Sequence, residues 1–148
     1  MLKIYTDAAF DDRSGLGTYC LVVVTDKGFK DWSVDHCDGF TNSTDAEYVG
    51  LRAAVELARA AHVAECLIMC DSMAAIDRLQ AAFKHRYVAP VAGLYVRHFK
   101  GHQAEKQGAF IDEDVKRHHW ADVQAGAELD RRLDARKTGA YNDKAKET

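Results

Sequence analysis

The sequence predicts an α/β fold in which helices cover a mixed β-sheet, and three observations indicate it. Three strand-like segments follow one another before any helical pattern begins. Two further strand-like segments then alternate with three helical segments, which gives the order β-β-β-α-β-α-β-α. Short turns suit antiparallel neighbours, whereas connections through helices join parallel strands. The first, fourth and fifth strands are therefore expected to be parallel.

Apolar runs mark the three opening strands. The first covers about Leu2–Thr6, and the second covers Gly17–Thr25 after an Asp- and Gly-rich turn. Within the second, Cys20-Leu21-Val22-Val23-Val24 is the uninterrupted apolar run that is typical of a buried strand. Asp26-Lys27-Gly28 predicts a hairpin turn, after which Phe29–Val34 returns as the third strand.

The first helix is expected to begin near Thr44 and to end near His62. Thr44-Asp45-Ala46-Glu47 fits the capping-box pattern of a helix start. Three later residues share one line of this helix, which predicts its inner face: Leu51, Val55 and Ala58.

The second half of the chain alternates strands with helices. A fourth strand, Glu65–Cys70, precedes a helix at about Met73–Phe83. A fifth strand, Leu94–Phe99, is followed by a polar loop and a last helix at about Glu113–Ala135. We therefore expect one domain over residues 1–137 and a polar, flexible tail over residues 138–148.

The composition is that of a globular domain. The 148 residues are 47% apolar and 29% charged, which allows a substantial core and argues against a disordered chain. No segment approaches membrane-spanning length, and the amino terminus has no signal pattern. Cys20, Cys37, Cys66 and Cys70 lie mostly in apolar runs, which predicts reduced thiols and a cytoplasmic location. Cys66 and Cys70 lack the second ligand pair of a zinc site.

Four carboxylates occupy positions where the pattern predicts burial. Asp7 and Asp71 close the first and fourth strands, whereas Glu47 and Asp122 lie on the inner lines of helices. A buried charge is costly unless it is paired or binds a metal ion. No cationic residue takes a comparable position in these segments, so a divalent cation is the expected counter-charge. The inner line of the last helix is predicted as Val115, His119, Asp122, Gly126, Leu129 and Leu133.

The predicted topology brings these carboxylates together. If the first and fourth strands are parallel neighbours, Asp7 and Asp71 lie at the same edge of the sheet, on strands about 4.8 Å apart. Three of the four residues also have a simpler interpretation on their own, whereas an inner-face charge in mid-helix, as at Asp122, has none. Glu47 fits a capping box with Thr44, Asp71 fits a helix cap, and Asp7 fits a turn. Four such coincidences in one small domain favour a shared site.

These residues also lie in short motifs that resemble those of ribonuclease H, the enzymes that cut the RNA strand of an RNA/DNA hybrid. The resemblance covers about residues 1–136 and implies a ribonuclease H-like fold, a five-stranded mixed sheet with the order 3-2-1-4-5 flanked by helices. The matching segments are Ile4-Tyr5-Thr6-Asp7, Thr44-Asp45-Ala46-Glu47-Tyr48, Cys70-Asp71-Ser72, Lys100-Gly101-His102 and Trp120-Ala121-Asp122.

The resemblance implies a Mg²⁺-dependent endonuclease that leaves 5′-phosphate and 3′-hydroxyl ends. In this family two Mg²⁺ ions, which Mn²⁺ can replace, bridge the carboxylates and the scissile phosphate. The implied ligands are Asp7, Glu47, Asp71 and Asp122. His102 is implied on a loop, where it assists proton transfer or product departure; a solvent-exposed loop histidine without that role is the alternative.

The resemblance also implies an RNA/DNA hybrid as the partner of a monomeric protein. The implied substrate contacts are Asn42, Ser43, Thr44 and Ser72. Of these, Ser72 can contact the hybrid backbone or cap the next helix, and the cap is favoured. Asn and Ser side chains can both reach a ribose 2′-hydroxyl, the group that distinguishes RNA from DNA.

The chain departs from the family pattern in several places. Ala8-Ala9 follow Asp7 where Gly-Ser is common, and Ser43-Thr44 stand where many members have Asn-Asn. His118 takes the position, four residues before Asp122, where the family often has Asn. Only Lys84-His85-Arg86 supply basic character where some relatives insert a basic protrusion. A compact form that binds hybrid weakly is therefore expected.

Two other functions stay open. One is a superfamily relative that cuts DNA, such as a junction resolvase, and the other is a hybrid-binding module without catalysis. The Lys-Gly-His segment and the β-β-β-α start favour the hybrid nuclease, and the presence of all four carboxylates argues against the module. The net charge of −3 excludes none of these, because setting the four site carboxylates aside leaves 19 acidic residues against 20 Lys and Arg.

Overall fold

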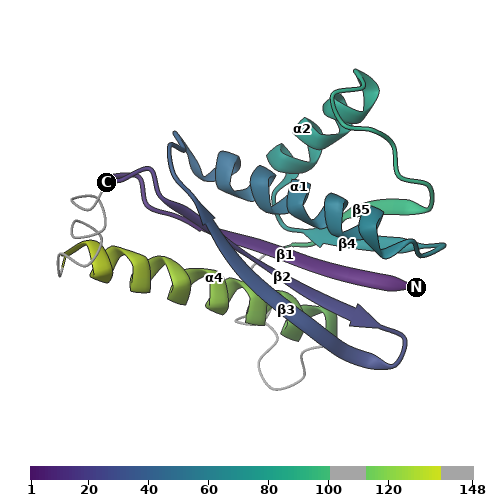
Figure 1. Cartoon of the computed structure of the whole chain (residues 1–148), viewed down its shortest axis with the longest axis horizontal. Helices are drawn as coiled ribbons and strands as arrows, with labels where there is room; N and C mark the ends of the chain where they lie inside the picture. Colours follow the sequence, from purple (N-terminus) through teal and green to yellow (C-terminus); the bar gives the residue numbers. More distant parts are fainter. Residues whose placement is uncertain (101–112, 138–148) are drawn as a thin grey trace.

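The computed structural model of the protein describes residues 1–100 and 113–137. These residues form one five-stranded sheet with α1 and α2 on one face and α4 on the other (Figure 1). The predicted tail, residues 138–148, lies outside the described residues. The elements are β1 (Leu2–Phe10), β2 (Gly17–Thr25), β3 (Gly28–Cys37), α1 (Ser43–Ala61), β4 (Cys66–Cys70), α2 (Met73–Lys84), β5 (Leu94–His98) and α4 (Glu113–Lys137).

The strand order is β3-β2-β1-β4-β5, as predicted. β2 pairs antiparallel with both β1 and β3, whereas β4 pairs parallel with both β1 and β5. The parallel register of β1 with β4 runs from Leu2 opposite Cys66 to Thr6 opposite Cys70. The expectation that strands one, four and five are parallel is thus confirmed.

The first strand is longer than predicted, and this changes the place of Asp7. The prediction that Asp7 closes the strand is wrong, because β1 continues to Phe10. Asp7 pairs with Cys20 of β2, and Phe10 pairs with Gly17. The antiparallel partner therefore extends β1 beyond the point where its parallel partner β4 has ended. Asp7 is the first residue of β1 past the last β4 pair.

The two faces of the sheet carry separate cores. Ile4 and Ile68 are fully buried in the cluster that also contains Leu51 of α1. Tyr5 and Met69, one residue further along each strand, are buried in the cluster that contains alanines of α4. Since successive side chains of a strand point to opposite faces, the odd-numbered positions of β1 face α4.

The first helix has a different cap from the one predicted. Asn42, rather than Thr44, is the N-cap, and its Oδ1 accepts a hydrogen bond from the Asp45 amide at 3.0 Å. Asp45 in turn accepts hydrogen bonds from the amide and the hydroxyl of Thr41. The start of α1 is thus satisfied without Glu47, which removes the capping interpretation of that carboxylate.

The last helix presents a different line to the sheet than predicted. Val115 and Leu129 are buried as expected, but His119 is exposed and His118 is buried instead. Small side chains explain the rotation, because Ala121 and Ala125 allow the helix backbone to approach the strands closely. The Thr18 hydroxyl donates to the Ala125 carbonyl at 2.6 Å and fixes this approach.

None of the described helices is long and apolar enough to cross a membrane.

Candidate metal centre

β1 and β4 bring two carboxylates to the α4 face of the sheet. Asp71 directly follows Cys70, the β4 residue opposite Thr6, so Asp7 and Asp71 take corresponding positions on neighbouring strands. Asp7 shares the face of Tyr5 and is 3% exposed. Its Oδ1 accepts a hydrogen bond from the Ala8 amide at 2.9 Å, which orients the carboxylate. Asp71 is half-buried.

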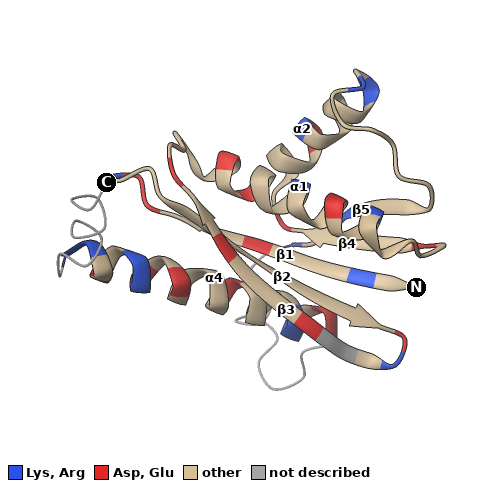
Figure 2. Cartoon of the chain, in the orientation of Figure 1, with Lys and Arg blue, Asp and Glu red and all other residues tan. Residues whose placement is uncertain are grey.

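The two helices that flank this point supply the other carboxylates. Glu47 lies one turn before Leu51 on α1, and its charge acts on Asp7. Asp122 on α4 is within hydrogen-bonding reach of Asp7. Figure 2 shows acidic segments on β1, α1 and α4. The four carboxylates singled out from the sequence therefore meet in one cluster.

Electrostatics in the cluster oppose ionisation. Burial raises the pKa of Asp7 far above its ordinary value, and the charges of Glu47 and Asp71 and the contact with Asp122 raise it further. Burial raises the pKa of Glu47 as well, and the charge of Asp71 adds to this effect. In the absence of a cation the cluster therefore retains protons that isolated carboxylic acids would lose.

The donor set fits a hard divalent cation. Carboxylate oxygens are the ligands that Mg²⁺ and Mn²⁺ prefer in proteins. The Oε2 atom of Glu47 is buried and has no hydrogen-bond partner among the described residues. In the same part of the chain, neither Asp7 nor Glu47 forms an ion pair with Lys or Arg. A bound cation would satisfy both observations.

Two side chains that the sequence did not single out as ligands also lie here. One ligand atom each of Asp7, Asp71 and His118 lies within 4.8 Å of the other two. The same holds for Glu47, Cys70 and Asp71. Burial raises the pKa of the Cys70 thiol, so it remains protonated and suits the core better than a metal. The only sequence signal for His118 is that it occupies a position where the family often has Asn.

The backbone around Asp71 is tied to the neighbouring strand and helix. The His98 ring nitrogen Nε2 lies 3.1 Å from the Asp71 carbonyl oxygen, and the Phe99 amide donates to the Cys70 carbonyl at 2.8 Å. Ser72 is the N-cap of α2, where its hydroxyl accepts from the Ala75 amide at 3.1 Å. The prediction that Ser72 caps the helix is thus confirmed.

The other implied substrate residues gather at the start of α1, one turn before Glu47. The Asn42 Oδ1 accepts the capping hydrogen bond of α1, and the side-chain amide nitrogen of Asn42 donates to the Thr41 hydroxyl at 3.3 Å. Ser43 is exposed and Thr44 is half-buried. His102 lies outside the described residues, so its predicted role stays a prediction.

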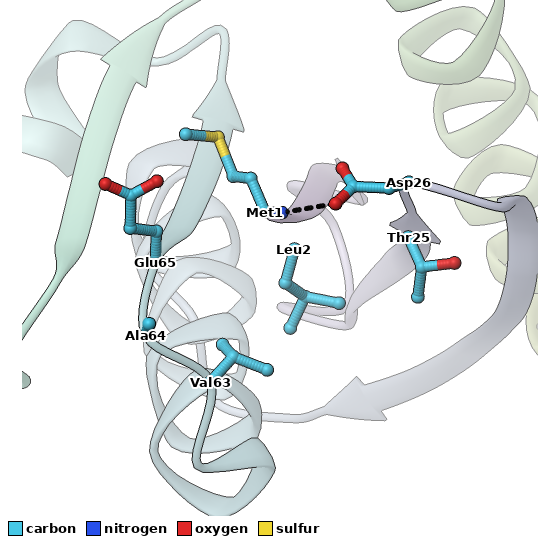
Figure 3. Close-up of a pocket in the computed structure, with 7 residues that line it drawn as sticks. All are labelled: Met1, Leu2, Thr25, Asp26, Val63, Ala64 and Glu65. Atoms are coloured by element: carbon cyan, nitrogen blue, oxygen red, sulfur yellow. Dashed lines mark hydrogen bonds and ion pairs between the residues drawn. The ribbon is translucent and has the colours of Figure 1, made fainter.

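A pocket of about 540 Å³ lies elsewhere, at the amino-terminal end of β1 (Figure 3). Leu2 and Val63 line it, and the Met1 amino group forms an ion pair with Asp26 at 2.8 Å. None of the four clustered carboxylates lines this pocket. It is therefore separate from the candidate metal centre.

The fold and the carboxylate cluster define a ribonuclease H-like protein. Residues 5–98, more than half of the chain, match the family described as reverse transcriptase-like, and the chain belongs to this family. The resemblance to ribonuclease H that the motifs indicated is thereby confirmed. A comparison with curated protein sequences finds no match.

Solved ribonuclease H structures share the fold at low sequence identity. LC11-RNase H1, isolated from compost by a metagenomic approach, is 20% identical, with a TM-score of 0.65 over 89% of this chain and 97% of that one. The RNase H domain of prototype foamy virus is 15% identical, with a TM-score of 0.64 over 85% and 92%. LC11-RNase H1 has also been solved in complex with an RNA/DNA hybrid; that chain is 19% identical, with a TM-score of 0.56 over 72% and 90%.

Proposed function

We propose that this protein is a divalent-metal-dependent endonuclease that hydrolyses the RNA strand of RNA/DNA hybrids. The products would carry 5′-phosphate and 3′-hydroxyl ends. The observation that carries the proposal is the convergence of Asp7, Glu47, Asp71 and Asp122 in one cluster, in which burial and the neighbouring carboxylates raise the pKa values of Asp7 and Glu47. Such a cluster is costly to the folded chain unless it serves to hold cations.

In the proposed reaction the protein's own residues bind the metal ions and position their ligands. Asp7 and Asp71, with Glu47 and Asp122 on either side, would hold two Mg²⁺ ions, which Mn²⁺ can replace. When bound, such ions activate water and stabilise the charge that develops on the scissile phosphate. The Ala8 amide orients the Asp7 carboxylate, and the His98 ring restrains the Asp71 backbone. These contacts position the ligands before substrate arrives.

The start of α1 is the proposed contact for the substrate backbone. Ser43 is exposed beside the Asn42 cap, and Thr44 lies between them and Glu47. A hydroxyl or amide at this point can recognise a ribose 2′-hydroxyl, and the helix amino terminus favours the charge of a phosphate. His102 is proposed to assist proton transfer or product departure. A monomeric state and a cytoplasmic location stay predictions.

Cleavage of matched substrates tests the proposal. An end-labelled RNA/DNA hybrid, double-stranded RNA and double-stranded DNA of one sequence are each incubated with the protein over a range of Mg²⁺ concentrations. We expect metal-dependent cleavage of the RNA strand in the hybrid alone, with 5′-phosphate products. Cleavage of duplex DNA would instead indicate a resolvase-like relative, and hybrid binding without cleavage would indicate a non-catalytic module.

A further inference from the structure

A buried histidine faces the carboxylate cluster from α4. His118 is 3% exposed, and one of its ring nitrogens lies within 4.8 Å of carboxylate oxygens of Asp7 and Asp71. Two ligands on opposite sides of one octahedral Mg²⁺ ion are about 4.0–4.2 Å apart, because each lies about 2.0–2.1 Å from the ion. A small rotation of a side chain would therefore let all three residues share an ion.

The orientation of this ring follows from its place in the fold. His118 lies one helical turn before Asp122, so both side chains project from the same side of α4. Its ring packs against Phe99, with centroids 5.1 Å apart and planes inclined by 33°. The Phe99 amide donates a hydrogen bond to the Cys70 carbonyl at the end of β4. This bond restrains Phe99 and so restricts the orientation of the His118 ring that packs against it.

An imidazole changes what the cluster prefers to bind. Mg²⁺ is a hard ion that favours oxygen ligands and gives up its waters reluctantly. Neutral imidazole suits transition ions, and affinity for nitrogen-containing sites rises from Mn²⁺ along the first row. A nitrogen at a position where the family often has Asn therefore adds a donor that Mn²⁺ accepts more readily than Mg²⁺.

We propose that His118 is an imidazole ligand of the cation site formed with Asp7 and Asp71, and that it shifts the preference of this site from Mg²⁺ toward Mn²⁺. The inference rests on the proposed function only for the presence of a divalent ion at the cluster. It concerns metal binding by the free protein, so its test needs no nucleic acid.

Pulsed EPR of the protein with sub-stoichiometric Mn²⁺ reads the ligand directly. We expect an imidazole nitrogen coupling in the wild type that is retained in His119→Asn and lost in His118→Asn. His119 is a matched control, because it is the exposed neighbour on the same helix. Absence of the coupling in the wild type, or its persistence in His118→Asn, overturns the assignment.

Metal titration of the same variants measures the preference. Even the loss of a residue that only hydrogen-bonds to a metal ligand lowers metal affinity by about 10–100-fold. We therefore expect the Mn²⁺ Kd of His118→Asn to rise at least about tenfold, while the Mg²⁺ Kd changes less than about threefold. Equal losses for both ions would show that His118 only supports the carboxylates and would overturn the preference.

A folding failure of His118→Asn leaves the inference testable. In that case the nitrogen coupling is compared in variants that replace, one at a time, each of the other six histidines with Asn: His36, His62, His85, His98, His102 and His119. Retention in all six assigns the coupling to His118, and loss in one of them overturns the assignment. The two proposals also fail separately: a nitrogen coupling without hybrid cleavage would contradict the nuclease alone, and cleavage without the coupling would contradict the role of His118 alone.

Discussion

The carboxylate of Asp7 is fixed by the sheet and surrounded by other acids. The residues of β1 before and after Asp7 pair with β2, and the Ala8 amide donates a hydrogen bond to the Asp7 Oδ1. Its backbone therefore cannot move away from the other acids without breaking the strand, and a rotation of its side chain would break the hydrogen bond from the Ala8 amide. Like-charge crowding at a fixed point costs stability in the metal-free protein and provides affinity when a cation binds.

Replacing Asp7 with Asn should separate stability from activity. We expect Asp7→Asn to stabilise the metal-free fold by at least about 1 kcal/mol, roughly 2–4 °C in Tm, because Asn has no carboxyl group that folding forces to stay protonated among other acids. Hybrid cleavage should fall at least about 100-fold, since the loss of a residue that only hydrogen-bonds to a metal ligand already lowers activity about 10–100-fold. Thermal unfolding in EDTA and a cleavage assay measure the two effects.

Asp130 provides the control for this change. It is exposed on α4, so Asp130→Asn should alter neither Tm nor cleavage appreciably. Wild-type cleavage in Asp7→Asn would contradict the site assignment.

The raised pKa values of Asp7 and Glu47 predict how stability depends on pH. The native state keeps protons that the unfolded chain releases above about pH 4. The stability contribution is therefore complete below that pH and is lost as the pH rises through the raised native pKa values. The metal-free protein should become less stable between about pH 4 and pH 8, as followed by denaturant unfolding in EDTA.

Asp7→Asn should flatten this profile, and saturating Mn²⁺ should reverse its direction, because the cation binds the deprotonated carboxylates. A wild-type profile in EDTA that is level over this range would show that the carboxylates do not interact as described.

At the level of elements, α1 approaches the sheet through a glycine. A Cβ at Gly50 would lie 2.9 Å from the Tyr19 Cβ and 3.0 Å from the Thr6 hydroxyl oxygen. Gly126 on α4 is the opposite case, since a Cβ there would meet no described atom within 4 Å. The two positions therefore test whether the close approach of α1, which carries Glu47 to the cluster, is required.

The two glycine-to-alanine variants should change stability in opposite directions. Gly126→Ala should stabilise by about 0.5–1 kcal/mol through helix propensity. Gly50→Ala gains the same propensity but overpacks the α1 contact, at a cost of about 1–3 kcal/mol. Urea unfolding measures both values, and a similar gain for both variants would refute the tight contact.

Helix α4 shows where sequence periodicity is insufficient. Apolar spacing located the helix and the burial of Val115 and Leu129, but it placed His119 on the inner line instead of His118. The small residues Ala121 and Ala125 determine the rotation, because close packing depends on size as well as hydrophobicity. Weighting small residues at i, i+4 spacing would have identified His118.

At the level of the whole molecule, the parallel strands and the meeting of the four carboxylates could be predicted from the sequence pattern, whereas the full strand order was implied by the resemblance to ribonuclease H. Short turns and helical connections leave few topologies, and parallel strands place Asp7 and Asp71 at one edge. The full length of β1 could not be predicted, because it depends on the pairing of Asp7 with Cys20 on a different strand. The Asn42 cap likewise depends on a choice between neighbouring polar residues.

The segment between α2 and β5 predicts weak binding of hybrid. α2 ends at Lys84 and β5 begins at Leu94, and the described residues between them form no helix. Few cations are available there for phosphate contacts, so we expect a weaker Kd than that of a protrusion-bearing ribonuclease H at equal salt, with a shallower salt dependence. Filter binding measures both, and comparable affinity at equal salt would contradict the expectation.

Anomalous X-ray diffraction from crystals soaked in Mn²⁺ tests most directly whether the cluster is a cation site. We predict an anomalous peak within coordination distance of Asp7 and of at least one other member of the cluster. Carboxylates that turn toward Lys or Arg partners, with no peak between them in the soaked crystal, would contradict the assignment.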